Sequence, residues 1–382
     1  MANVLTDLAA DIYKAADVVG RELVGFIPSA TINANGSDSA RAAKGDVVRA
    51  AFTRAATAVN VSESMTIPEG TDQTVDNKTL SITKARAVQI PYTGEDVLHL
   101  NNGIGFETVY GDQIAQAMRV LTNEMESDLA TEAYQNASRA FGTAGTTPFG
   151  SNFSEVAEIR QILVDNGMPT DNQVSLILNT LAGTNLRQLA QLQKANEAGG
   201  TDLLRQGTLL DLQGMMIKES AQVKSHTKGT GASYLFNDAT AAIGDTTIAV
   251  DTGSGTILAG DIITFNGDTN KYVVNTALSG GSLVIGATGL RTAVADDAAI
   301  TVGNSYTANV AFHRRALELA VRAPAVPQNG DIADDALTVQ DPISGLVFEV
   351  RVYKGYRKTM IEVAASWGVK AWKSDFIAVL AG

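Results

Sequence analysis

The side chains with the widest chemical range in this sequence are three histidines, because an imidazole can bind a metal or move a proton near neutral pH. His99, His226 and His313 stand far apart, and none belongs to H-E-x-x-H or another closely spaced metal-binding pattern. Each is therefore interpreted as a surface or packed histidine. The chain also has no cysteine, no Gly-x-Ser-x-Gly elbow and no Gly-Lys dipeptide of a phosphate-binding loop. These absences predict a protein that is not an enzyme and has no catalytic residue, metal ligand or cofactor.

Two acidic, glycine-containing turns offer several oxygen atoms at short spacing. They are DTGSGT at 251–256 and NGDTN at 266–270, and neither continues into the distal glutamate of a calcium-binding loop. Both are interpreted as structural turns, with a cation site as the alternative. NGDTN also separates the β-branched runs DIITF and KYVV, and Asn-Gly in that setting predicts a β-hairpin.

Composition excludes several classes of protein. The 382 residues are 45% apolar and 18% charged, which is typical of a folded chain, and the length favours two or three structural regions. The formal net charge of −12 disfavours general binding to nucleic acid or to an anionic membrane. No apolar run approaches the ~18 residues of a membrane-spanning helix, and the N-terminal residues do not form a signal-peptide pattern.

Hydrophobic spacing predicts two helices and an extended arm in the first part of the chain. Apolar residues recur at helical spacing over 4–24, and the longest helical pattern covers 106–141, about 50 Å at 1.5 Å per residue. Between them, 45–92 contains strand patterns separated by a polar tip, and two strands cannot bury a core of their own. This segment is therefore predicted to be an arm that lies on another surface.

An α/β pattern follows the long helix. Ser154 is the predicted N-cap of a helix that ends at Gly167, and VSLILN at 174–179 is a predicted buried strand. Thr184 is the predicted cap of a second helix, and LLDLQGMMIKES at 209–220 is a predicted pair of strands.

Residues 226–303 interrupt this pattern with short strands. Five runs, TTIAV, DIITF, KYVV, SLVIG and AAITV, are separated by turn signals, which is typical of a small barrel or sandwich. A helix is predicted over 311–322, with the pair Arg314 and Arg315 making a salt bridge within or between subunits, and strands end the chain from 345 onward. The segment 226–303 is therefore interpreted as an insertion into an α/β domain.

The order of these parts resembles that of the major capsid proteins of tailed bacteriophages, whose fold is shared with the herpesvirus capsid floor, and the resemblance covers nearly the whole chain. PEGTDQTVDNKTLSITKARAVQIPYTGEDV resembles the extended loop of that family, and LLDLQGMMIKES a strand of its A (axial) domain. LAGDIITFNGD, KYVV and ANVAFHRRALELAVRAP resemble the coat proteins of short-tailed Salmonella phages, in which a β-barrel insertion (I) domain interrupts the A-domain. ASWGVKAWKSDFIAVLAG resembles the closing strands, although Lys373-Ser374-Asp375 stands where many relatives have Arg-Pro-Glu.

The resemblance implies an α+β capsid-floor fold with an inserted small β-barrel. Its implied parts are an N-terminal arm (1–40), an extended loop or E-loop (41–98), the spine helix with part of the P-domain (99–150), the A-domain in two parts (151–225 and 304–345), the I-domain (226–303) and the closing P-domain strands (346–382).

The resemblance also implies a function, which is self-assembly through hexamers and pentamers into an icosahedral shell around phage double-stranded DNA. The shell would form in the bacterial host cytoplasm and become the virion capsid. Its implied partners are further copies of the chain, a scaffolding protein, a portal protein and a decoration protein, with no strong sequence-specific DNA binding and no membrane. Asp7, Asp11 and Asp17 on the N-terminal helix are the candidate dock for a basic scaffold helix, with a solvated helix face as the alternative.

Charged residues of the E-loop, the insertion and the basic pair are candidate contacts between subunits: Glu69, Asp72, Lys78, Asp261, Asp268, Arg314 and Arg315. Asp261 and Asp268 are expected to face solvent or a neighbouring subunit. A Lys–Asn cross-link, which some capsids of this fold form, is not expected at Lys78. The alternatives are an encapsulin-like nanocompartment shell, a phage tail or adhesin protein, and a hydrolase whose triad assembles from distant positions.

Overall fold

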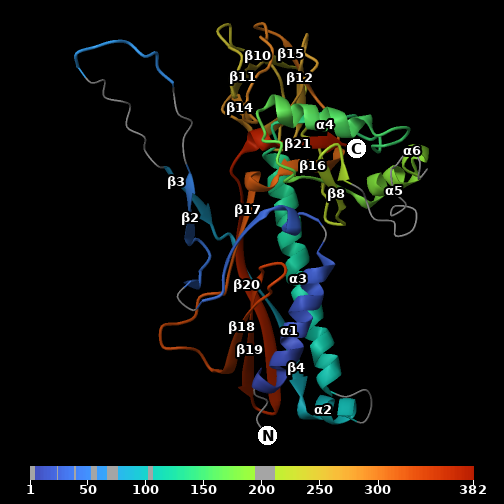
Figure 1. The fold of residues 1–382 in the computed structure, drawn as a ribbon, viewed down its shortest axis with the longest axis vertical. Coiled ribbons are helices and arrows are strands. Elements are labelled where there is room, and N and C mark those ends of the chain that lie inside the picture. The colour runs from blue at the N-terminus through green and yellow to red at the C-terminus, as the bar shows by residue number, and fades with distance from the viewer. Residues whose placement is uncertain are drawn as a thin grey trace.

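A long helix runs through the molecule in a computed structural model that describes residues 5–23, 25–37, 40–52, 58–66, 76–101, 106–193 and 211–382 (Figure 1). This helix, α3 (Phe106–Gln135), confirms the predicted spine. The predicted end at residue 141 was too late, because the helix ends at Gln135 and is followed by β5 (Arg139–Gly142). Apolar side chains at helical spacing form one buried stripe along this helix: Ile114, Met118, Leu121, Met125 and Leu129. The predicted N-terminal helix is also confirmed, because α1 (Leu5–Glu22) packs beside α3.

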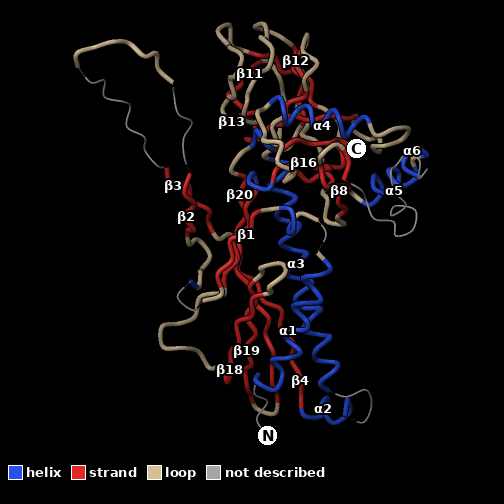
Figure 2. Tube along the Cα trace, viewed as in Figure 1, coloured by secondary structure: helices blue, strands red, loops and turns tan. Residues whose placement is uncertain are grey.

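A six-stranded sheet lies along the lower part of α3 (Figure 2). Its path is β1-β17-β20-β19-β18, and β4 also pairs with β20. The strands are β1 (Thr31–Asn35), β4 (Lys84–Thr93), β17 (Leu317–Arg322), β18 (Ala333–Gln340), β19 (Val347–Gly355) and β20 (Lys358–Ala371). Trp367 of β20 is fully buried, and its indole donates a 2.9 Å hydrogen bond to Asp128 of α3. This sheet and the two helices therefore form one packed body.

The predicted arm is confirmed for β2 (Val47–Phe52) and β3 (Asp76–Ser81), which pair only with each other and project from the body (Figures 1 and 2). Leu80, at the base, is buried in a small cluster with Ile82 and Ala320. The prediction was wrong for the last part of 45–92, because β4 pairs with β20 over ten residues and belongs to the body. The pattern of a single strand does not show which distant strand it pairs with, and the partner of residues 84–93 is residues 358–367 of β20.

A second sheet crosses the upper part of the molecule in the order β5-β21-β16-β6-β8-β7, with β9 also on β16. Its strands are β5, β6 (Val174–Leu178), β7 (Asp211–Leu212), β8 (Met215–Glu219), β9 (Ser225–His226), β16 (Tyr306–His313) and β21 (Ile377–Ala381). The buried strand and the strand pair predicted before residue 220 are thereby confirmed. The remaining helical elements are α2 (Gly94–Asn101), α4 (Ser154–Asp165), α5 (Thr180–Gln188), α6 (Ala190–Gln193), and the 3-10 turns η1 (Ile27–Ser29), η3 (Arg314–Ala316) and η4 (Ser374–Phe376).

Two predicted helix caps were misplaced. Ser154 is the first residue of α4 rather than its cap, whereas Gly167 ends that helix as predicted, with φ +84° and a 2.8 Å backbone bond to Val164. Thr184 lies inside α5, which Asn179 caps by accepting a 2.9 Å bond from the backbone nitrogen of Ala182.

The helix predicted over 311–322 was wrong. The segment completes β16, turns through η3 and continues as β17. Every residue of β17 is buried, because the strand lies between β1 and β20 and is covered on its faces. A strand buried on both faces loses the alternation of apolar and polar residues, so its apolar run cannot be distinguished from a helix by spacing.

The predicted small barrel is confirmed above this sheet. Its strands are β10 (Tyr234–Phe236), β11 (Thr247–Asp251), β12 (Ile262–Phe265), β13 (Lys271–Ser279), β14 (Ser282–Ile285) and β15 (Ala299–Val302). They pair in the order β12-β15-β10-β11-β14-β13, and β13 pairs back to β12, which closes the barrel. The predicted hairpin joins β12 to β13, with Gly267 at φ +90° in its turn. The barrel has its own apolar cluster, in which the rings of Phe236, Phe265 and Tyr272 meet edge to face.

Candidate assembly surfaces and the barrel junction

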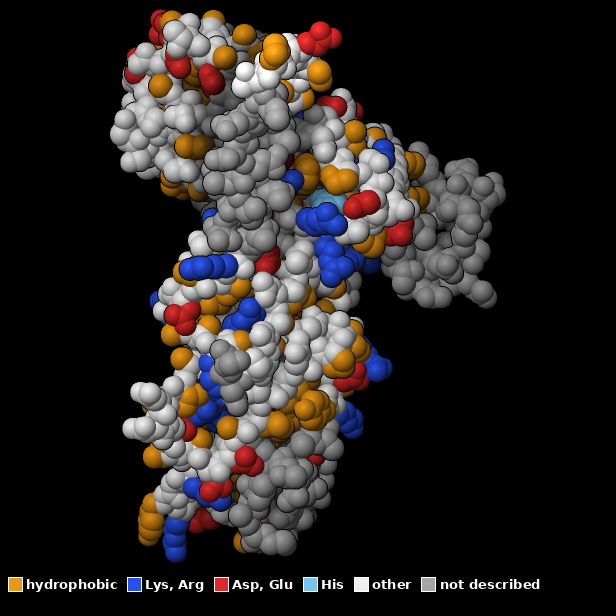
Figure 3. Space-filling view, turned by 60° about the vertical axis from the view of Figure 1, so that its left-hand side comes forward, with side chains coloured by type: hydrophobic (Ala, Val, Ile, Leu, Met, Phe, Trp, Pro, Cys, Tyr) orange, Lys and Arg blue, Asp and Glu red, His pale blue; other side chains and the backbone are white. Residues whose placement is uncertain are grey.

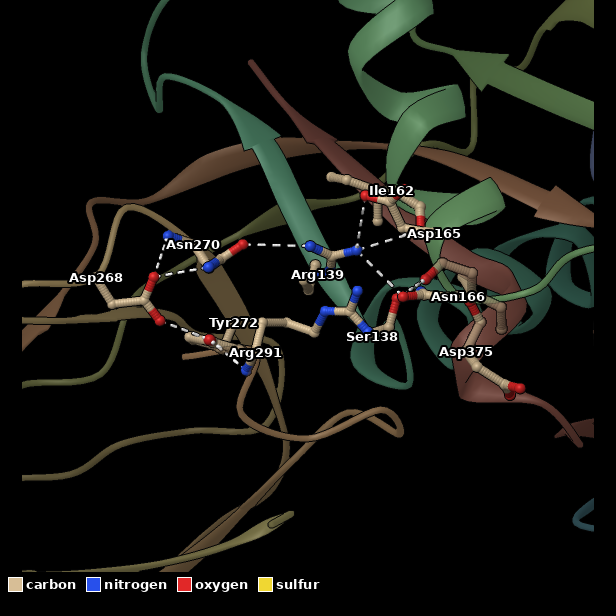
Figure 4. A network of polar contacts seen from close by, with 11 residues as sticks. Ser138, Arg139, Ile162, Asp165, Asn166, Asp268, Asn270, Tyr272, Arg291 and Asp375 are labelled. Atoms are coloured by element: carbon tan, nitrogen blue, oxygen red, sulfur yellow. Dashed lines mark hydrogen bonds and ion pairs between the residues drawn. The ribbon is translucent and has the colours of Figure 1, made fainter. Parts of the chain in front are cut away.

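Strand β5 joins the barrel to the rest of the molecule, because it pairs with β13 on one side and with β21 on the other. Arg139 begins β5, and its buried guanidinium donates hydrogen bonds to the side chain of Asn270 (3.2 Å) on the barrel and to Asn166 (3.2 Å) beyond α4 (Figure 4). A third bond reaches the carbonyl of Ile162 at 3.3 Å. Burial, together with the charge of Arg291, lowers the pKa of Arg139. Because separating a buried charge from its partners is costly, this network fixes the barrel relative to α4.

The acidic turn of the barrel hairpin belongs to the same network (Figure 4). Asp268 Oδ1 accepts hydrogen bonds from the backbone and side-chain nitrogens of Asn270, at 2.9 and 2.7 Å, and so orients the amide that Arg139 binds. Asp268 Oδ2 accepts a 2.6 Å bond from the hydroxyl of Tyr272, which itself accepts a 2.9 Å bond from the backbone nitrogen of Arg291. Asp268 is half-buried and bonded within its own chain, so a contact with a neighbouring subunit stays a prediction.

The expectation that Asp261 faces solvent or a neighbouring subunit was wrong. Only 1% of Asp261 is exposed, and its carboxylate pairs with His226 Nε2 at 2.8 Å. It also accepts backbone hydrogen bonds from Leu258 (2.7 Å) and Gly229 (3.0 and 3.1 Å). His226, predicted to be a surface or packed histidine, is packed, and the carboxylate of Asp261 ties β9 to the first strand of the hairpin. A sequence pattern of acidic turns could not separate this buried acid from the exposed ones.

The basic pair was expected on a helix and in a salt bridge. Arg314 and Arg315 instead lie exposed on η3, and neither forms an ion pair within the described residues. Burial lowers the pKa of Lys218 on β8, and the nearby positive charge of Arg314 lowers it further. Lys and Arg side chains also gather where the upper part of the molecule meets the long sheet (Figure 3). A contact between subunits through the pair stays a prediction.

The arm carries the other predicted contact residues. Lys78 lies on β3, opposite Ala50 of β2, rather than at the tip. Glu69 and Asp72 lie outside the described residues. Segment 58–66 is exposed throughout, and the projecting hairpin contacts the body only near its base (Figure 1). An isolated two-stranded hairpin is marginally stable in water, so the arm needs a second surface.

The predicted scaffold dock lies on α1, where the three acids differ in setting. Asp17 pairs with Arg21 at 3.0 Å within the helix. Asp11 is half-buried and lines a groove of about 300 Å³ between α1 and α3, beside Lys14 and Arg119. Of Asp7 only the helical backbone is described. The acidic face is thus partly balanced by cations, and docking of a basic helix stays a prediction.

The sequence analysis missed a buried carboxylate at the centre of the molecule. It is Glu126 of α3, which is only 6% exposed although charged side chains of a helix usually face water. Its oxygens accept hydrogen bonds from the backbone nitrogens of Phe26 (2.6 Å) and Ile27 (2.9 Å) and from Ser220 Oγ (2.9 Å). Burial raises the pKa of Glu126 despite these donors. The feature of the sequence that relates to this contact is Gly25. A Cβ at position 25 would lie 1.9 Å from Glu126 Oε1, so a larger residue does not fit there.

No three His, Asp or Glu side chains within the described ranges lie close enough together to hold a metal ion. No helix in the described part of the chain combines the length and the apolar character that crossing a bilayer requires.

Comparison with known proteins identifies the fold. No protein-family model matches the sequence, and no curated protein matches it. A chain of the capsid of the cyanophage P-SCSP1u is 11% identical, with a TM-score of 0.50 over 92% of this chain and 86% of that chain. A chain from Mycobacterium phage Che8 is 15% identical, with a TM-score of 0.48 over 88% of this chain and 85% of that one. A chain of the mature capsid of bacteriophage PhiM1 is 9% identical, with a TM-score of 0.47 over 94% and 86%.

At these low sequence identities the likeness establishes the fold alone. The comparison rests on the cyanophage chain, because its TM-score of 0.50 is the highest of these three. The chain therefore has the fold seen in that phage capsid chain, which here consists of an α+β body, the long helix α3 and a projecting arm.

Proposed function

We propose that this chain is the subunit of an icosahedral phage shell that encloses double-stranded DNA. The observation that carries the proposal is the projecting β2–β3 arm on a body with the phage-capsid fold. An arm with no core of its own gains stability when it lies across another copy, and many weak contacts of this kind become strong when a shell closes.

The barrel is proposed to be the inserted I-domain of the Salmonella-phage type, exposed on the shell. Its closed pairing and separate apolar cluster support this role, because an inserted domain has a core of its own. The Arg139 and Asp261 networks would keep it in a fixed orientation on the shell. Scaffold-directed assembly, with α1 as the dock, and partnership with a portal and a decoration protein belong to the same proposal.

The test is negative-stain electron microscopy with sedimentation, on the chain expressed alone and together with a candidate scaffolding protein. Closed particles of uniform size are expected in at least one preparation. Monomers or small rings in both would overturn the shell function while leaving the fold intact. Nuclease-protected double-stranded DNA in particles from infected cells is expected for a virion capsid, and its absence would favour a storage compartment.

A further inference from the structure

The turn of the barrel hairpin contains an asparagine followed by a glycine, a pair that can change chemically without an enzyme. The backbone nitrogen of the second residue attacks the side-chain carbonyl carbon of the first, and a glycine leaves this approach free of a Cβ. The sequence contains five such pairs, which begin at Asn35, Asn102, Asn166, Asn266 and Asn329. The pair at 102 lies outside the described residues, and the structure gives the other four pairs different surroundings.

Asn266 and Gly267 are both exposed at the tip between β12 and β13. Within the described part of the chain, no hydrogen bond involves the side chain of Asn266 or the backbone nitrogen of Gly267. The backbone around them is fixed, because the nitrogen of Asn266 donates to the carbonyl of Ala299 and the nitrogen of Asp268 to that of Phe265, each at 3.0 Å. The two groups that must react are therefore free while the hairpin stays folded.

Asn166 has the opposite setting, at the end of α4. Its side-chain nitrogen donates to Ser138 Oγ (3.0 Å) and to the carbonyl of Asp375 (2.8 Å), and its oxygen accepts from Arg139 at 3.2 Å (Figure 4). The backbone nitrogen of Gly167 donates to a carbonyl of the last turn of α4 at 2.8 Å. Both reacting groups are therefore held, and this pair reacts only when the junction opens.

The other two described pairs are intermediate, because one reacting group of each is held. The glycine nitrogen of the pair at 329 donates to the carbonyl of Pro327 (2.9 Å), and the side-chain oxygen of Asn35 accepts from the backbone nitrogen of Ser37 (3.0 Å). Breaking one hydrogen bond of ordinary net strength slows a reaction by about fivefold, and breaking four slows it by more than about a hundredfold. The pair at the hairpin tip is thus the most reactive of the four.

We propose that Asn266 is a site of spontaneous deamidation and that the product loosens the junction between the barrel and the body. The backbone nitrogen of Gly267 bonds to Cγ of Asn266, the Cγ–Nδ2 bond breaks, and ammonia leaves with the proton that the backbone nitrogen gives up. Water then opens the cyclic imide at one of its two carbonyls. The products are aspartate and isoaspartate, in which the chain runs through the former side-chain carbonyl.

The product changes the turn that orients the junction network. It adds a carboxylate beside Asp268, and isoaspartate also lengthens the turn by one methylene group. Asp268 holds the amide of Asn270 and the hydroxyl of Tyr272, and Asn270 accepts the hydrogen bond from Arg139 (Figure 4). Repulsion between the two carboxylates and the longer turn both act against these contacts. The inference goes beyond the proposed function and does not depend on the formation of a shell.

Ageing of the purified, unassembled chain in mildly alkaline buffer tests the reaction, with peptide mapping by mass spectrometry at intervals. The amide of Asn266 is expected to become an acid about fivefold faster than those of Asn35 and Asn329, and more than about a hundredfold faster than that of Asn166. In denaturant the four rates are expected to converge, because the hydrogen bonds are lost. Equal rates at 266 and 166 in the folded chain, or the same order of rates in denaturant, would overturn the proposal.

Asn266→Gln is the matched control, because the longer side chain does not form the five-membered imide. This variant is expected to lose the modified peptide, to keep the rates at the other pairs and to match the circular dichroism of the wild type. The aged fraction, separated by ion exchange, is expected to unfold at a lower denaturant concentration than fresh protein. Asn266→Asp adds the charge without the methylene group and is expected to lie between the two. An aged fraction as stable as fresh protein would overturn the effect on the junction.

Discussion

Replacing Asp261 by alanine tests whether this acid is a structural tie of the barrel rather than a surface contact. The variant removes the acceptor of three donors: the backbone nitrogens of Gly229 and Leu258 and the imidazole of His226. The carboxylate is 1% exposed, so water does not replace it without a rearrangement of the barrel root.

The magnitude follows from these lost partners. A buried donor left without an acceptor costs about 1–3 kcal/mol, so the loss of the acceptor for three donors costs about 3–9 kcal/mol in sum. A rearrangement of the barrel root that lets water reach these donors recovers part of the sum. We therefore expect Asp261→Ala to lower the free energy of unfolding by about 3–5 kcal/mol.

The assay is denaturant unfolding of the unassembled subunit, followed by circular dichroism and by tryptophan fluorescence. Both tryptophans, Trp367 and Trp372, lie outside the barrel, so fluorescence follows the body while circular dichroism follows the whole chain. Asp296→Ala, an exposed acid of the barrel, is the control and is expected to stay within about 0.5 kcal/mol of the wild type. An Asp261→Ala subunit as stable as this control would refute the argument.

Three further outcomes are expected. Tyr272→Phe removes the hydroxyl that bridges Asp268 and a backbone nitrogen, and should cost about 1 kcal/mol in denaturant unfolding; a cost near zero would mean that the bridge contributes nothing. Gly368→Ala places a Cβ 2.1 Å from the carbonyl oxygen of Ser81 and should cost about 1–3 kcal/mol and speed proteolysis of the arm; an unchanged digestion pattern would contradict this account of its base. Burial raises the pKa of Glu126 above 4.5, so its contribution to stability is full below pH 4.5 and is lost as pH rises through the raised pKa. The stability of the wild type relative to Glu126→Gln should therefore fall as pH rises from 4.5 towards neutral, and a flat or rising difference in unfolding experiments would contradict the shift.

The short-range features of the fold could be predicted from the sequence. The strand runs of the barrel and the Asn-Gly turn of its hairpin depend on neighbouring residues, and both were confirmed. The stripe of α3 was predicted for the same reason, since residues three and four apart share a helix face. In the candidate sites, the exposed arm followed from its polar tip and its lack of a core.

The buried carboxylates could not be predicted, because an acid looks the same in a sequence whether it meets water or three donors. Asp261 and Glu126 are buried only because His226, Phe26 and their neighbours arrive from distant parts of the chain. The basic pair was placed on a helix for a related reason, since the strands that cover β17 on both sides come from other regions.

The sequence by itself determined the local periods of the two long helices, the short strands of the barrel and the positions of most turns, because these depend on contacts within a few residues. The tertiary structure decided which strands lie between others, which charges lose water and which strand joins the barrel to the body. Those outcomes depend on pairing between distant segments, such as β4 with β20. The residues of one segment do not indicate which distant segment it will pair with.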